Sequence, residues 1–162
     1  MTTRTLVILR HAKAAHPHAT ADFDRPLTTR GQIDAAEAGA WLSQHHAPDL
    51  VLCSPARRTR ETWHGVALAL TAAPQVRYLN EIYTGSAFEL LTLVTSVDAD
   101  DGTVLLIGHN PALSQLSALL DPASADPAGL RTAEAAVHTA DLRWPEWGPG
   151  AATRSAAHLA RG

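Results

Sequence analysis

Short apolar runs alternate along the chain with longer segments in which apolar residues recur at helical spacing. Each run is four or five residues long and is followed by a polar or turn-forming stretch, which is typical of strands buried in a sheet. Because such strands carry few polar side chains on either face, other elements must cover both faces of the sheet. The predicted strands are TLVIL (5–9), DLVLC (49–53), VRYL (76–79) and TVLLI (103–107).

The segments between these strands predict helices. Thr28 or Thr29, and later Ser86, can cap a helix N-terminus, whereas Pro48 and Pro74 can end a helix. The predicted helices are residues 28–46, 56–72, 86–97 and 111–120. The apolar positions near one face are Ile33, Ala36, Ala40 and Trp41 in the first helix, and Leu90, Leu91 and Val94 in the third. Alternating strands and helices predict an α/β fold, a three-layer α/β/α sandwich with a mostly parallel central sheet.

The remaining segments predict loops and two terminal strands. Residues 10–27 have no regular period and predict a long loop. Residues 121–131 are rich in Pro, Ala and Asp, which predicts a linker or flexible loop. Residues 134–142 and 152–159 alternate weakly in polarity and predict strands joined by a turn over residues 145–150.

Composition limits the class of protein. The 162 residues, 46% of them hydrophobic and 18% charged, predict one globular domain spanning residues 1–162. A net charge of −3 argues against nucleic acid or an anionic membrane as the main partner. No apolar run approaches the roughly 20 residues that span a bilayer, and the N-terminus does not resemble a signal peptide. With Cys53 as the single cysteine, no internal disulfide can form, so a cytoplasmic location is expected.

Polar clusters follow three of the four predicted strands. Arg10-His11 follows the first strand, residues 54–58 (SPARR) follow the second, and Gly108-His109 follows the fourth. The carboxyl ends of parallel strands lie on one rim, where open α/β sheets bind ligands. Two histidines and several arginines would converge there with few acids nearby, which favours a compact dianion such as phosphate.

Three sequence motifs resemble those of a known family. "LRHAKA", "SPARRTRET" and "LLIGHNP" occur in order, each at the end of a predicted strand. They resemble the motifs of the histidine phosphatase superfamily, which has the phosphoglycerate-mutase-like fold. The small size, "RHAK", "RPLTTRG" at residues 25–31 and "GHNPAL" are most similar to the SixA-type phosphohistidine phosphatase branch. The resemblance covers roughly residues 4–120.

The resemblance implies roles for five residues. His11 corresponds to the nucleophile that takes up the phosphoryl group, and Arg10 and Arg58 correspond to the arginines that hold the phosphate oxygens. His109 corresponds to the second histidine, which also donates to the phosphate. Glu81, in "LNEIYTG", lies near the position of the acidic proton donor found in mutases and broad phosphatases, although its flanking residues match poorly. No metal or other cofactor is implied.

Other positions depart from the family pattern. Ala12 stands where a glycine is common, and Lys13 stands where an acid often follows. Both changes point away from the mutase subgroup. Arg57 does not fall at the matching position and is expected to be a surface or secondary charge.

The chemistry of these groups supports phosphoryl transfer. An imidazole attacks phosphorus only through an unprotonated ring nitrogen, so His11 must be neutral. A backbone carbonyl bonded to the other ring nitrogen would fix the required tautomer, and neighbouring cations should lower the pKa of His11. Bound phosphate should favour protonated His109. Positioned cations would supply most of the stabilisation of the transition state.

The expected substrate follows from the leaving group. An alkoxide needs a proton donor to leave, whereas the imidazole of phosphohistidine can arrive already protonated. Because the residues around Glu81 match the family's proton donor poorly, the sequence favours phosphohistidine in a protein as the substrate. A phosphotransfer domain of a two-component relay is the partner that the resemblance implies. Two alternatives remain open: a broad phosphomonoesterase that acts on small phosphorylated substrates, and a phosphate-binding module without turnover. The sequence indicates no oligomeric state.

Several side chains outside this set have more than one interpretation. Arg25 could line the phosphate site or pair with Asp22 or Asp24. Two close pairs of histidines could indicate a metal site: His16 with His18, and His45 with His46. No cysteine or acidic cluster completes a ligand set, so these four side chains are expected to be exposed to solvent.

The tryptophans and the cysteine are expected to be structural. Trp41 and Trp63 are predicted core residues, and Cys53 is predicted to end a buried strand. Trp144 and Trp147 could pack against the edge of the sheet or meet a partner.

Overall fold

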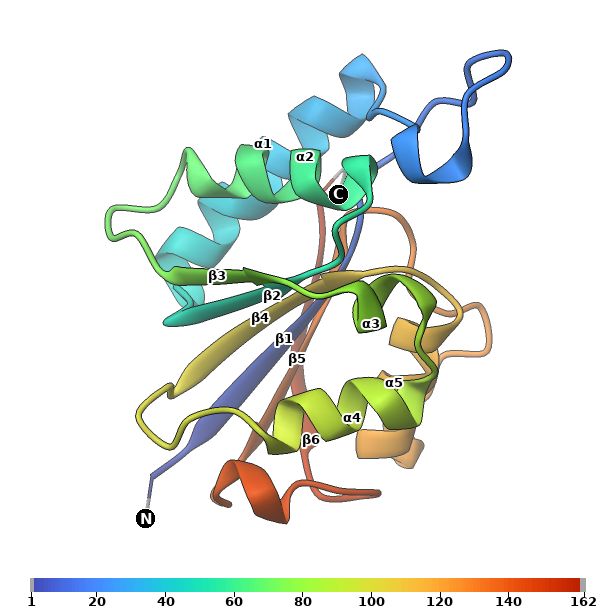
Figure 1. Ribbon diagram of the computed structural model, residues 1–162. Coiled ribbons are helices and arrows are strands. Elements are labelled where there is room, and N and C mark those ends of the chain that lie inside the picture. The colour runs from blue at the N-terminus through green and yellow to red at the C-terminus, as the bar shows by residue number, and fades with distance from the viewer. Residues whose placement is uncertain (1, 161–162) are drawn as a thin grey trace.

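A six-stranded sheet in the order β3-β2-β4-β1-β5-β6 forms the centre of the computed structural model, which describes residues 2–160 (Figure 1). The first four strands in chain order run parallel to one another. At one side of the sheet, β5 pairs antiparallel with β1, and β6 pairs antiparallel with β5. The predicted mostly parallel sheet is therefore confirmed. The strands are β1 (Arg4–Arg10), β2 (Leu50–Cys53), β3 (Gln75–Tyr78), β4 (Thr103–Gly108), β5 (Glu134–Ala140) and β6 (Thr153–Leu159).

Helices cover both faces of this sheet, which confirms the three-layer α/β/α architecture (Figure 1). Along β1, Val7 and Leu9 face the core under α1 and α2, whereas Leu6 and Ile8 face the core under α4 and α5. The helices are α1 (Thr29–His45), α2 (Arg57–Ala67), α3 (Asn80–Thr84), α4 (Ala87–Thr95) and α5 (Ala112–Leu120). Short 3-10 turns form at Asp22–Asp24, Pro122–Ser124 and Trp144–Glu146. Among the described residues, no helix has both the length and the apolar character needed to cross a bilayer.

The predicted buried face of α1 was wrong. Ile33 is 52% exposed, and Ala36 and Ala40 are also exposed. The buried positions of α1 are instead Gly31, Asp34, Ala35, Ala38, Gly39 and Leu42. The reason is close packing of α1 on α2: a Cβ atom at Gly39 would lie only 2.7 Å from the backbone of Val66. Small residues permit this approach, so they occupy the interface and Ile33 turns outward.

The two predicted caps are confirmed. The hydroxyl of Thr28 accepts a hydrogen bond from Gly31 N at 2.9 Å, and Ser86 forms a capping box with Glu89. However, α2 ends at Ala67 instead of continuing to residue 72, and α3 was not predicted. Both differences arise in short segments in which the apolar spacing alone does not mark where a helix begins or ends.

The C-terminal segments are better packed than the sequence suggested. Residues 121–131 contain the Pro122–Ser124 turn and the buried Leu130, so this connection is not a loose linker. Trp144 and Trp147 pack together in the core beneath α4, with ring centroids 4.8 Å apart. Trp63 is buried as predicted, whereas Trp41 is half-buried and stacks on His158.

Candidate active site

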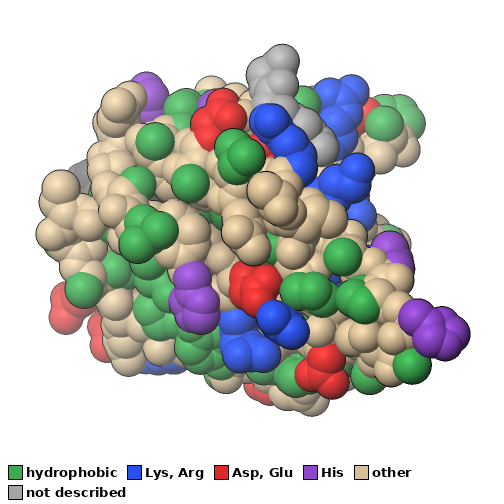
Figure 2. Space-filling view, turned by 90° about the horizontal axis from the view of Figure 1, so that it is seen from above, with side chains coloured by type: hydrophobic (Ala, Val, Ile, Leu, Met, Phe, Trp, Pro, Cys, Tyr) green, Lys and Arg blue, Asp and Glu red, His purple; other side chains and the backbone are tan. Residues whose placement is uncertain are grey.

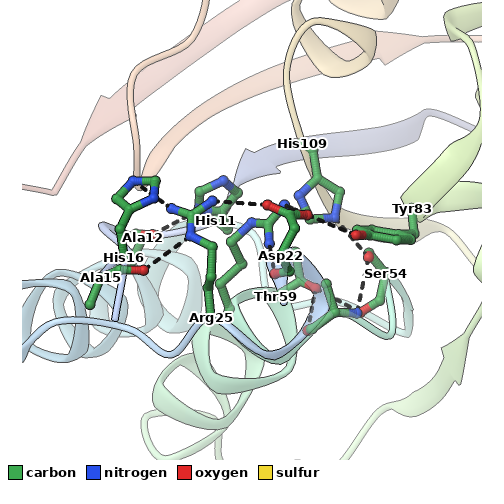
Figure 3. A network of polar contacts seen from close by, with 12 residues as sticks. His11, Ala12, Ala15, His16, Asp22, Arg25, Ser54, Thr59, Tyr83 and His109 are labelled. Atoms are coloured by element: carbon green, nitrogen blue, oxygen red, sulfur yellow. Dashed lines mark hydrogen bonds and ion pairs between the residues drawn. The ribbon is translucent and has the colours of Figure 1, made fainter. Parts of the chain in front are cut away.

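Three polar segments meet at the carboxyl ends of adjacent parallel strands. Arg10 at the end of β1 pairs with Gly108 at the end of β4, and Cys53 at the end of β2 pairs with Ile107. The next residue of each strand, namely His11, Ser54 and His109, therefore projects from the same edge of the sheet (Figure 3). The ring centroids of His11 and His109 lie 5.4 Å apart. The predicted convergence of the three clusters is present.

His11 is a buried, neutral imidazole with a fixed tautomer. Its Nδ1 atom lies 2.7 Å from the carbonyl oxygen of Ala12, and His11 is only 8% exposed. A carbonyl can only accept, so Nδ1 carries the proton and Nε2 keeps its lone pair. Burial, and then the charges of Arg58 and Arg10, lower the pKa of His11 to about 4 although the bond to Ala12 opposes the shift. At neutral pH this ring can act as a nucleophile.

Two arginines, the buried Arg58 and the half-buried Arg10, supply positive charge beside His11. Arg58, in the first turn of α2, donates from its two terminal nitrogens to the backbone oxygen and a carboxylate oxygen of Asp22, at 2.8 and 3.2 Å. Arg10 donates to the carbonyl of Leu130 at 3.0 Å. Among the described residues, the buried Nε atoms of both arginines have no hydrogen-bond partner. Unpaired cationic N–H groups of this kind suit an anionic ligand.

His109 lies opposite His11 and leaves one ring nitrogen free for a ligand. Its Nε2 atom lies 2.7 Å from the hydroxyl oxygen of Ser54, whereas its buried Nδ1 atom has no partner among the described residues. The Ser54 hydroxyl can give its proton to Nε2, which leaves the remaining ring proton on Nδ1. Burial and the charge of Arg58 lower the pKa of His109 to about 3, so the ring is neutral without a ligand.

The structure adds Asp22 and Tyr83 to the site, and the sequence did not reveal either role. The carboxylate of Asp22 accepts from Arg25 at 3.1 Å, from Arg58, and from the hydroxyl of Tyr83 at 2.7 Å (Figure 3). The bond from Tyr83, followed by those from the arginines, lowers the pKa of Asp22 to about 2. The Tyr83 ring also packs edge-on against His109, with centroids 5.5 Å apart. An ionised carboxylate therefore lies beside the cationic site.

Of the two interpretations of Arg25, pairing with Asp22 is present; Arg25 also bonds to Ala15 O and His16. The expected pairing with Arg25 was the signal in the sequence that pointed to Asp22. Tyr83 lies in the unpredicted helix α3 and carried no signal at all.

Other candidate residues lie outside this cluster. Arg57 forms an ion pair with Glu61 on the surface of α2, as expected for a secondary charge. Glu81 is exposed, and within residues 2–160 its side chain makes no hydrogen bond or ion pair, so the structure does not join it to the site. His16, His18 and His45 are exposed as expected, whereas His46 is half-buried, so that part of the prediction was wrong. The part of the chain that the structure describes contains no group of three or more potential metal-ligating side chains.

Charges on the surface are mixed. On the face seen from above, the basic side chains form separate groups with acidic side chains beside them (Figure 2). Arg58, which is buried, and Arg10, which is half-buried, instead place two positive charges close to His11.

The chain is similar to known proteins in sequence and in structure. Residues 6–100 match the family model of the histidine phosphatase superfamily, branch 1. The phosphohistidine phosphatase SixA of Escherichia coli is 31% identical over 133 residues, which cover 80% of this chain and 82% of that protein. An uncharacterized protein of Mycobacterium tuberculosis is 33% identical over 162 residues, covering 94% of this chain and all of the relative.

Solved structures extend the similarity to the whole fold. A proposed SixA-type phosphohistidine phosphatase from Nakamurella multipartitia is 35% identical with a TM-score of 0.84, covering 98% of this chain and 96% of that one. The protein histidine phosphatase SixA complexed with tungstate is 27% identical with a TM-score of 0.83, and 97% of each chain is covered.

Proposed function

The chain belongs to the histidine phosphatase superfamily, and on this basis we propose that it dephosphorylates phosphohistidine in a protein through a phospho-His11 intermediate. The observation that carries the proposal is the neutral His11 ring, with Nδ1 bound to Ala12 and Nε2 free, next to Arg10, Arg58 and His109. The similarity to E. coli SixA, a phosphohistidine phosphatase, supports the same substrate class.

The proposed reaction has two steps. The Nε2 lone pair of His11 attacks phosphorus, and the bond between phosphorus and the substrate imidazole breaks, with its electron pair going to that imidazole. Arg10, Arg58 and the Nδ1–H of His109 bind the equatorial oxygens, where negative charge spreads in the transition state. Water then attacks phospho-His11, which releases inorganic phosphate and restores the neutral ring.

The carboxylates near the site support an imidazole leaving group. Asp22 is held ionised at a pKa of about 2, and Glu81 makes no contact with the cluster. An ionised carboxylate has no proton to give to an alkoxide, so an alkyl phosphate lacks the help that its leaving group needs. A phosphoimidazole that is protonated on its other nitrogen leaves as neutral imidazole and needs no acid.

The alternative activity, hydrolysis of small phosphate esters, would require a proton donor such as Glu81. Replacement of Glu81 with glutamine therefore separates the two functions. Under the proposed function, Glu81→Gln leaves the rate on phosphohistidine unchanged. A large loss of activity on small esters, with those esters the faster substrates, would favour the alternative.

The direct test is to trap the intermediate. Brief incubation with a ³²P-phosphohistidine phosphotransfer domain should label the protein with an adduct that is labile in acid and stable in alkali. His11→Ala should abolish this label, whereas His18→Ala, which changes an exposed histidine, should not. An enzyme that releases phosphate from small esters much faster than from phosphohistidine, with no label on His11, would contradict the proposal.

A further inference from the structure

The connection between α5 and β5 holds Arg10 through both its backbone and its side chain. Ala133 N lies 3.1 Å from the backbone oxygens of both Arg10 and His11. The end of the connection is therefore hydrogen-bonded to the backbone at the carboxyl end of β1. Three residues earlier, the carbonyl of Leu130 accepts the hydrogen bond from the Arg10 guanidinium at 3.0 Å. The position of one backbone carbonyl therefore controls how the Arg10 side chain is oriented.

That carbonyl is fixed by the start of α5. The amide of Asn110 donates from Nδ2 to Leu130 O at 2.8 Å, so Asn110 and Arg10 share one acceptor. Leu130 N donates to the hydroxyl oxygen of Ser114 at 2.9 Å. The Ser114 hydroxyl in turn donates to Asn110 Oδ1. Asn110 and Ser114 thus hold both backbone polar groups of a residue that is only 4% exposed.

Gly129 allows this close contact. Its φ of +72° lies in the left-handed region, and a Cβ atom there would lie 2.9 Å from Ser114 Oγ. A side chain at this position would therefore push the Leu130 segment away from α5. The backbone conformation of Gly129 and the side chains of Asn110 and Ser114 act together on one carbonyl.

We propose that Asn110 is a positioning residue which, with Ser114, fixes the Leu130 carbonyl and thereby aims the Arg10 guanidinium at the phosphoryl oxygens. The inference rests on the proposed function, because that function places phosphate against Arg10. The bond to Leu130 occupies one terminal nitrogen, Nη1, whereas the other, Nη2, makes no hydrogen bond among residues 2–160 and remains for the anion. Without Asn110, the guanidinium keeps its charge but loses its fixed direction.

The test measures binding of tungstate, a tetrahedral oxyanion, and needs no turnover. Asn110→Leu should weaken tungstate binding about tenfold, the effect of losing one oriented, charge-assisted hydrogen bond. Ser114→Ala should weaken it in the same direction and provides a second variant if Asn110→Leu does not fold. Gln115→Ala is the matched control, because this exposed side chain lies in the same turn of α5 and makes no hydrogen bond among the described residues.

A double-mutant cycle separates positioning from a general structural role. In an Arg10→Ala background, Asn110→Leu should produce no further loss of tungstate affinity, because no guanidinium remains to be aimed. An equal loss in both backgrounds, or no loss in the wild-type background, would overturn the inference. Failure of the wild type to hydrolyse phosphohistidine would instead count against the proposed function, since the tungstate cycle is read without catalysis.

Discussion

The Nδ1 atom of His11 lies 2.7 Å from the carbonyl oxygen of Ala12, the next residue in the chain. This contact sets the tautomer locally, while burial and the arginines keep the ring uncharged. The same small group of atoms thus determines which nitrogen is free and whether it is free at neutral pH.

The first prediction concerns the charge of His11. Because its pKa is lowered to about 4, the ring should remain neutral from pH 8 down to about pH 5 and be half protonated near pH 4. NMR titration of the ring nitrogens checks this, and Nε2 should be the unprotonated nitrogen throughout. Arg58→Met should raise the pKa of His11, since it removes a nearby cation. A midpoint near 6.5 in the wild type would contradict the prediction.

The second prediction concerns stability against pH. The pKa values of His11 and His109 are about 4 and about 3 in the folded state, below the ordinary value of 6.5. Between pH 6.5 and 4 the unfolded chain therefore binds protons that the folded chain does not, so stability falls as pH falls. Each histidine should contribute up to about 1.4 kcal/mol per pH unit in this window.

Urea unfolding at several pH values measures that slope. His109→Gln should reduce it by removing one contributing histidine, while His46, His138 and His158, whose pKa values burial also lowers, still contribute. Asp22 should contribute little above about pH 5, because its folded pKa of about 2 and its ordinary value of 3.8 both lie well below that pH. A stability that does not change between pH 6.5 and 4.5 would be the contrary result.

The third prediction concerns Asp22 as a competing anion. Its carboxylate and backbone oxygen occupy both terminal nitrogens of Arg58, the residue expected to bind phosphate. Asp22→Asn removes a negative charge from the proposed anion site and should tighten binding of inorganic phosphate about tenfold at pH 7, about 1.4 kcal/mol. Isothermal titration calorimetry measures this effect.

Asp24→Asn is the matched control for that measurement. It changes the net charge equally in the same 3-10 turn, and among the described residues the Asp24 carboxylate makes no hydrogen bond. If both variants bind phosphate more tightly by the same factor, the effect comes from overall charge and the prediction is wrong. Weaker phosphate binding by Asp22→Asn would show that the carboxylate supports anion binding.

The fourth prediction concerns Tyr83. Its hydrogen bond is the largest cause of the lowered pKa of Asp22, so Tyr83→Phe should move that pKa from about 2 toward the ordinary value of 3.8. Titration of the carboxyl ¹³C resonance provides the measurement. Tyr78→Phe, in the edge strand β3, should leave it unchanged. If both variants titrate like the wild type, the bond from Tyr83 to Asp22 is not important in solution.

The fifth prediction concerns the packing of α1 on α2. A methyl group at Gly39 would lie 2.7 Å from the Val66 backbone, which cannot move as a side chain does. Gly39→Ala should therefore lower the free energy of unfolding by about 1–3 kcal/mol. Gly148→Ala, where nothing lies within 4 Å of the added atom, should have little effect in the same denaturation experiment.

The sequence by itself determined the elements whose causes are local. Apolar runs defined β1, β2 and β4, and the hydroxyls of Thr28 and Ser86 marked where two helices begin. The alternation of strands and helices also placed His11 and His109 at one edge of a parallel sheet. Side-chain chemistry and the geometry of parallel strands are enough for these conclusions, because they depend on few contacts between distant segments.

Only the tertiary structure decided the contacts that complete the site. Tyr83 and Asp22 are 61 residues apart and Arg10 and Leu130 are 120 apart, yet each pair is joined by a hydrogen bond. The outward position of Ile33 likewise depends on how closely α2 approaches α1. Such pairings depend on how whole elements pack, and the residue types alone are compatible with many of them. The sequence therefore specified the histidines and arginines of the candidate site, while packing selected the groups that orient and neutralise them.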